Sequence, residues 1–147
     1  MRNRRDDFSA LAPLYPDAKV IGVEIAAVQD RRQLERPNLE YVQGHIRDLL
    51  KFSTDQESRE GYFGYVFSRQ LLLGVVNWPG YIRSAASLLK PIRWLEAQET
   101  SMRFASATNE YIADDWLFCP ALVQDARAIG LDVEIGPRVM GLFRESG

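Results

Sequence analysis

Apolar residues along the chain form short runs that alternate with stripes at helical spacing. Four runs rich in β-branched and aromatic residues have the composition of buried strands: residues 18–25, 39–43, 63–68 and 93–98. Apolar residues at helical spacing, bounded by proline or glycine, predict helices over residues 8–15, 26–36, 81–89 and 120–129. Strands that alternate with helices indicate an α/β fold built on a mainly parallel sheet.

The last part of the chain has a different pattern. Residues 131–135 and 138–144 alternate between apolar and polar positions around the turn at Gly136 and Pro137. This alternation predicts two antiparallel strands at the edge of the sheet. Residues 53–60 are polar and predict an exposed loop. Because no repeat or linker interrupts the pattern, we predict a single domain over residues 1–147.

Composition narrows the classes of function. The 147 residues include 18 Lys and Arg and 20 Asp and Glu, which gives a net charge of -2. The chain therefore has no overall positive charge that would attract nucleic acid. The single cysteine, Cys119, has no internal disulfide partner. The chain shows neither a signal peptide nor an apolar stretch of the roughly 18 residues that a membrane helix needs. We therefore expect a cytoplasmic protein that binds neither nucleic acid nor membrane.

Several motifs occur in a fixed order between residues 11 and 99. The most specific are residues 77–83 (NWPGYIR), 88–91 (LLKP) and 94–99 (WLEAQE), which follow weaker matches over residues 14–24, 38–44 and 63–72. This series resembles the class I S-adenosylmethionine-dependent methyltransferases, and within them the fungal LaeA-like group associated with secondary metabolism. The resemblance implies a Rossmann-like parallel sheet with helices on both faces, and we expect a truncated version of it.

The departures from this family concern the cofactor. The family holds the methionine part of S-adenosylmethionine with a Gly-rich turn, whereas the only glycine before Glu24 is Gly22, inside a predicted strand. We expect the chain to begin within the family's first helix, without the first strand. Gly64 replaces an expected aspartate, and residues 92–93 (IR) replace a glycine pair, whose loss is expected to change the turn there. We predict no cofactor, because several contacts to S-adenosylmethionine are altered.

Three residues are candidates for acid–base chemistry. Glu24 matches the family's ribose-binding acid, and it can equally be an acid that caps the following helix. His45 stands where the family often has an acid near adenine, and it is either a general acid or base or a loop histidine without a task. Glu99, at the end of a predicted strand, is the third candidate. Substrate contacts are predicted at Arg69 and Gln70 after the third strand, and at the aromatic residues Trp78 and Tyr65.

A sheet that lacks its central strand has unpaired backbone groups, so we expect a homodimer or another partner chain to cover them. Three hypotheses for the function follow. In the first, the protein is a tailoring enzyme, a cyclase or isomerase that acts on a small polyketide-type molecule and has lost methyl transfer. In the second, it is a non-catalytic binding or regulatory subunit. In the third, it is part of a split methyltransferase.

Overall fold

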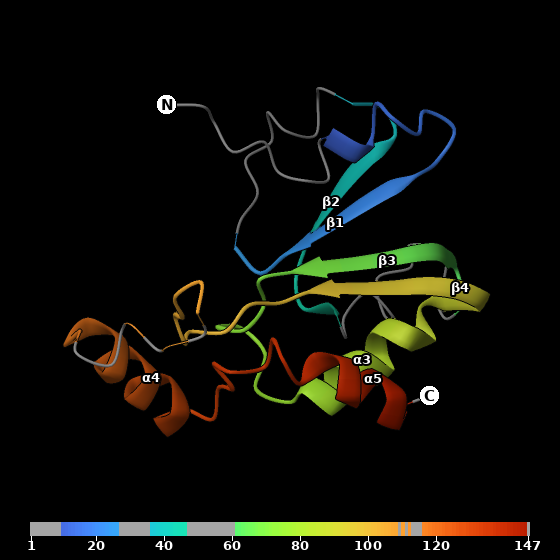
Figure 1. Cartoon of the computed structure of the whole chain (residues 1–147). Helices are drawn as coiled ribbons and strands as arrows, with labels where there is room; N and C mark the ends of the chain where they lie inside the picture. The colour runs from blue at the N-terminus through green and yellow to red at the C-terminus, as the bar shows by residue number, and fades with distance from the viewer. Residues whose placement is uncertain are drawn as a thin grey trace. The chain divides into compact units, whose positions relative to one another are not determined.

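A computed structural model of the chain describes residues 10–26, 36–46, 61–108, 110, 112 and 116–146 (Figure 1). The chain divides into two compact units, Met1–Arg59 and Glu60–Gly147, and each is described by itself. The loop predicted over residues 53–60 lies outside the described residues. So do most of the helix predicted over residues 26–36 and the start of the helix predicted over residues 8–15. The single domain predicted for residues 1–147 stays a prediction.

The first unit contains a parallel pair of strands. Strand β1 (Val20–Glu24) pairs with β2 (Leu39–Gln43) in continuous register, with Val20 opposite Leu39 and Glu24 opposite Gln43. The side chain of Asn38 fixes the start of this pair, because its Nδ2 lies 2.9–3.0 Å from the carbonyl oxygens of Ala12, Tyr15 and Ala18. Both strands occur where the sequence predicts them.

The second unit begins with a strand–helix–strand arrangement. Strand β3 (Phe63–Arg69) pairs in parallel with β4 (Leu89–Gln98), and helix α3 (Trp78–Ser87) connects them. The side chain of Asn77 caps α3 by accepting a hydrogen bond from the Gly80 N–H at 2.9 Å. A buried stripe at helical spacing, Trp78, Tyr81, Ile82 and Ala85, forms the apolar face of α3. The α/β class and the parallel strand pairing are therefore confirmed.

The two faces of the β3–β4 pair differ in exposure. Tyr65, Trp94 and Glu96 are exposed on one face, whereas Ser68 is buried and Val66 and its neighbours on the other face are partly covered. Figure 1 shows α3 and α5 on one side of this pair, and α3 contacts both β4 and α5. Because successive side chains of a strand alternate between faces, residues at even positions of β3 lie on the less exposed face.

The C-terminal residues correct one prediction. Helix α4 (Phe118–Ala128) occurs where a helix is predicted, but residues 138–144 form no strand and instead enter helix α5 (Val139–Ser146). Less exposed positions in α5 recur at residues 139, 142, 143 and 146, which is helical spacing, and the Val139 N–H bonds to the Ile135 carbonyl at 2.9 Å. Residues 131, 133 and 135 do alternate into the core, but they lie in irregular or turn segments and pair with no described strand. The predicted antiparallel pair is therefore wrong.

Strand β4 contains an irregular segment that includes residues 92–93, where the sequence predicts a changed turn. Phe63 lies opposite Leu89 and Tyr65 opposite Trp94, so four residues of β4 face the single residue Gly64. Within this bulge Ile92 has a φ of 58°, the left-handed conformation that glycine adopts readily. Its side chain is 98% exposed. Ile92 thus adopts a left-handed backbone conformation that glycine adopts more readily.

Ile92→Gly is expected to raise the free energy of unfolding by about 1 kcal/mol. The left-handed conformation costs a residue with a Cβ about 1–2 kcal/mol, and the greater freedom of glycine in the unfolded chain offsets part of this gain. Urea unfolding of both proteins measures the change. Ile92→Ala is the control, because alanine removes the exposed side chain and keeps the Cβ. An equal gain in both variants would show that the backbone conformation is not the cause.

Candidate functional site

The carboxyl ends of β3 and β4 carry polar side chains beside the first turns of α3. Ser68 is the last buried residue of β3 and lies opposite Ala97, and Glu99 lies two residues after Ala97, directly beyond the end of β4. Trp78 and Tyr81 come from the buried stripe of α3. We call these four residues, Ser68, Trp78, Tyr81 and Glu99, the strand-end cluster. Ligands of open α/β sheets bind at this end of the strands.

The carboxylate of Glu99 is held by one oxygen only. Its Oε1 accepts a hydrogen bond from the Leu71 N–H at 2.9 Å, whereas Oε2 is buried and has no hydrogen-bond partner among the described residues. Burial raises the pKa of Glu99 above its ordinary value of 4.5, although the backbone N–H groups of Leu71 and Leu72 act in the opposite direction. A carboxylate with a raised pKa and one unpaired oxygen is suited to proton transfer.

Tyr81 connects the other members of the strand-end cluster. Its ring meets that of Trp78 edge to face, with 5.5 Å between the ring centroids. Burial raises the pKa of Tyr81, the nearby Ser68 hydroxyl lowers it, and the negative charge of Glu99 raises it further. Ser68 and Glu99 therefore both lie within electrostatic reach of the Tyr81 hydroxyl.

Two further polar atoms of the strand-end cluster are buried without a partner. Trp78 Nε1 forms no hydrogen bond with any group in the described part of the chain, and Ser68 Oγ forms none of normal geometry there, although it lies close enough to the Tyr81 hydroxyl to lower the pKa of Tyr81 as a weak hydrogen-bond partner. A buried polar group without a partner costs about 1–3 kcal/mol, and such groups are few in native proteins. An indole donor, a hydroxyl and a carboxylate oxygen thus remain available at one end of a sheet.

The other residues predicted for substrate binding in this unit lie outside the cluster. Arg69 and Gln70 are exposed at the end of β3, where the Gln70 N–H bonds to the Gln98 carbonyl at 3.0 Å and Gln70 has a φ of 55°. Tyr65 lies on the exposed face of β3 and donates its hydroxyl to Glu96 Oε2 at 2.6 Å. Of the four predicted substrate contacts, Trp78 alone belongs to the cluster.

The remaining two acid–base candidates belong to the first unit. Glu24 Oε1 lies 2.9 Å from the Ile25 nitrogen and 3.3 Å from that of Ala26. The carboxylate therefore accepts hydrogen bonds from two backbone N–H groups of the turn that follows β1. These contacts lie within the turn after β1, and the helix that Glu24 would cap lies almost wholly outside the described residues, so both roles of Glu24 stay predictions. His45 is half-buried and lies two residues after the end of β2.

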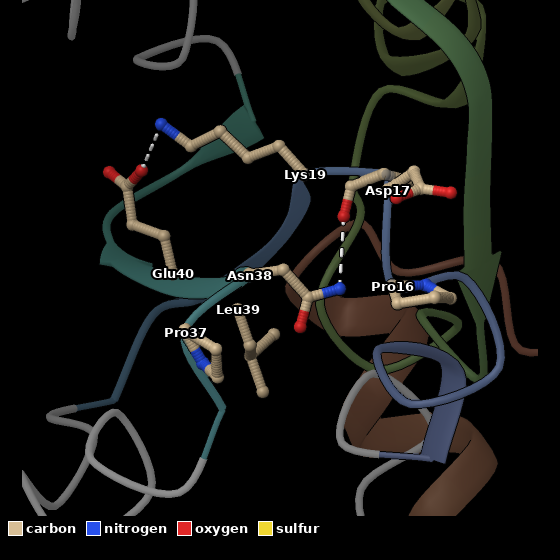
Figure 2. A pocket seen from close by; sticks show the side chains of 8 residues that line it. Pro16, Asp17, Lys19, Pro37, Asn38, Leu39 and Glu40 are labelled. Carbon is tan, nitrogen blue, oxygen red and sulfur yellow. Dashed lines mark hydrogen bonds and ion pairs between the residues drawn. The ribbon is translucent and has the colours of Figure 1, made fainter.

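Two surface hollows lie elsewhere. The first, of about 410 Å³, lies at the amino ends of β1 and β2 (Figure 2), where Lys19 and Glu40 form an ion pair at 2.7 Å and Asn38 bonds to the Ala18 carbonyl. The second, of about 680 Å³, lies beside α4, where Arg127 pairs with Glu134 and Arg138 with Asp132. None of the predicted site residues lines either hollow. Apart from Asp17 in the first hollow, their charged side chains are paired with one another.

Ser68 and Tyr81 are the members of the strand-end cluster that sequence reasoning missed. A signal for Ser68 exists, because a serine on the covered face of an otherwise apolar strand must find a polar partner. Tyr81 lies one helical turn after Trp78, which already was a candidate. The described residues contain no group of three or more His, Cys, Asp and Glu side chains arranged to hold a metal ion.

Comparison with protein-family models gives no match, and comparison with curated proteins gives none either. The resemblance to methyltransferases therefore depends on the motifs themselves. In the described part of the chain, no helix has the length and apolar character needed to cross a membrane.

Proposed function

We propose that the protein is a cyclase or isomerase that moves a proton on a small polyketide-type molecule, as a tailoring enzyme of fungal secondary metabolism. The observation that carries this proposal is the carboxylate of Glu99, which is anchored through one oxygen and unpaired at the other. We propose that the fold is a Rossmann-like methyltransferase fold. The order of the motifs and the two parallel strand pairs support this assignment.

Glu99 is suited to act as a general base on carbon. Because its pKa is raised by burial, the ionised carboxylate binds a proton more strongly than an exposed glutamate does. The Leu71 N–H fixes the orientation of the carboxylate. Cyclisation and isomerisation of carbonyl compounds need mainly an oriented substrate and a positioned acid or base.

A reaction without S-adenosylmethionine is part of the proposal. Glu24, which matches the family's ribose-binding acid, directs one carboxylate oxygen to its own following backbone. His45 stands in place of the acid near adenine, and the segment at Ile92 lacks the glycine pair. These two departures lie inside the matched region and, with the orientation of Glu24 toward its own backbone, support loss of the cofactor. Whether His45 or Glu24 supplies a second proton-transfer group stays a prediction.

A binding subunit is the second candidate function. The exposed face of the β3–β4 pair presents Trp94, which is 78% exposed, beside Tyr65 and close to the bulge at Ile92. Exposed aromatic residues are enriched where proteins contact partners, and a second copy of the chain is the partner that we propose. Under this alternative the chain binds without turning over a small molecule, so an assay of proton transfer separates the two functions.

Exchange of the α-protons of 1-tetralone in D2O tests the proposed function. We expect the full chain to accelerate exchange above the buffer rate, as followed by proton NMR. The rate is expected to rise with pH through the raised pKa of Glu99, because only the ionised carboxylate accepts a proton. A rate equal to that of buffer across this pH range would overturn the proposal in favour of a binding subunit.

A further inference from the structure

We propose that the indole N–H of Trp78 and the hydroxyl of Ser68 bind the carbonyl oxygen of an enolisable ketone whose neighbouring carbon gives its proton to Glu99. This inference rests on the proposed function and names the substrate class and the residues that recognise it. The strand-end cluster would then contain both parts of an enolisation site, a base for carbon and donors for oxygen.

The burial of Trp78 is the first argument. Its side chain is only 2% exposed, and Nε1 finds no acceptor among the described residues. Indole has one donor and no acceptor, and a buried indole N–H usually has a hydrogen-bond partner. An acceptor oxygen or nitrogen of a bound molecule would satisfy it.

Ser68 supplies the second argument independently. It is buried, at 7% exposure, on a strand whose covered face is otherwise apolar, and its Oγ forms no hydrogen bond of normal geometry in the described part of the chain, its nearest polar group being the Tyr81 hydroxyl whose pKa it lowers. Tyr81 joins the two donors, because its ring contacts Trp78 and its hydroxyl is close enough to Ser68 and Glu99 to respond to both. Trp78, Ser68 and Glu99 thus each contact Tyr81 or act on its hydroxyl.

The set of groups selects the ligand. The carboxylate of Glu99 repels an anionic ligand, and the unpaired N–H and O–H donors gain nothing from a cation without an acceptor atom. A neutral molecule with a carbonyl oxygen satisfies the donors, while the rings of Trp78 and Tyr81 favour a flat apolar body. An aromatic or conjugated ketone combines these properties.

The proton transfer balances without a further reactant. The α-carbon–hydrogen bond breaks and its proton passes to Glu99 Oε2, while the electron pair forms a carbon–carbon double bond and the carbonyl becomes an enolate oxygen. Trp78 and Ser68 donate hydrogen bonds to that oxygen, where negative charge develops. Return of the proton to a carbon or to the oxygen restores the carboxylate and completes an isomerisation.

Binding of 1-naphthol, a flat neutral mimic of an enol, tests the donors apart from turnover. The sequence has three tryptophans, so a nitrogen–proton correlation spectrum shows three indole N–H signals. Trp94→Phe and Trp116→Phe, at two exposed positions, assign the Trp78 signal by elimination. We expect 1-naphthol to shift the signal of Trp78 and leave those of the other two in place.

Ser68→Ala is expected to weaken 1-naphthol binding about tenfold, because a ligand loses one buried hydrogen bond. Ser84→Ala is the matched control, since the Ser84 hydroxyl already bonds to the Gly80 carbonyl at 2.9 Å, and its dissociation constant should equal that of the unmodified chain. An unshifted Trp78 signal, or equal affinity of the Ser68 variant, would overturn the inference. Naphthol binding without tetralone exchange would instead refute the proposed function alone.

Discussion

Glu99→Gln is expected to abolish most of the exchange of 1-tetralone protons, lowering the rate by at least about a hundredfold. Glutamine retains an oxygen that can accept the Leu71 N–H, so the hydrogen bond that anchors the side chain is kept. It cannot take up a proton near neutral pH. The variant therefore removes the base and leaves the local backbone in place, and proton NMR under the conditions of the unmodified chain measures the loss.

The same variant has an expected effect on stability that depends on pH. Since the folded protein raises the pKa of Glu99, the folded state holds this proton more tightly than the unfolded chain does. The stabilisation linked to Glu99 is therefore complete below 4.5, the ordinary pKa, and is lost as pH rises through the folded pKa. The free energy of unfolding of Glu99→Gln minus that of the unmodified chain should therefore be larger at neutral pH than at acidic pH. Urea unfolding of both proteins at the two pH values measures this difference.

Glu96→Gln, three residues earlier on β4, is the matched control. The hydroxyl of Tyr65 and then the amide of Gln98 lower the pKa of Glu96 by hydrogen bonding, at 2.6 and 2.7 Å. Its linked stability is present above its ordinary pKa and lost as pH falls, so the pH effect of this variant has the opposite sign. Exchange activity should be unchanged. Equal loss of activity in both variants would argue against Glu99 as the base.

Where periodicity and packing agree, the sequence predicts the structure well. Strand β2 matches its predicted limits, and helices α3 and α4 begin within three residues of theirs, because a proline lies in the first turn of each and Asn77 caps α3. The strand prediction for residues 138–144 is wrong because their apolar positions fit both the period of two of a strand and the spacing of a helix. As helix α5, these residues contact α3. Local periodicity does not predict such contacts between elements distant in the sequence.

The candidate site is predicted only in part for a related reason. The sequence identifies Glu99 and Trp78 as candidates because of their positions. Glu99 follows the strand predicted over residues 93–98, and Trp78 precedes the helix predicted over residues 81–89. Ser68 and Tyr81 look like ordinary strand and helix residues, and their importance appears only when burial leaves a serine hydroxyl and an indole N–H without partners. Sequence alone reveals which groups are polar; the three-dimensional packing reveals which of them remain unsatisfied.

Ile82→Ala is expected to lower the free energy of unfolding by about 2–5 kcal/mol. Ile82 is 2% exposed and lies in the buried stripe of α3, next to Tyr81 and one turn after Trp78. Removing its side chain leaves a cavity in the packing that fixes α3, and therefore loosens two members of the strand-end cluster at once. Urea unfolding measures the loss of stability, and the shift of the Trp78 indole signal by 1-naphthol should weaken with it.

Two further variants separate packing from chemistry in this experiment. Ile82→Val removes one methyl group, which costs about 0.5–1.5 kcal/mol, and should retain naphthol binding because α3 stays in place. Arg83→Ala, at the exposed neighbouring position, should change stability by less than about 0.5 kcal/mol. If Ile82→Ala cost no more than Arg83→Ala, the packing of α3 could not be what positions Trp78 and Tyr81, and the geometry of the strand-end cluster would need another support.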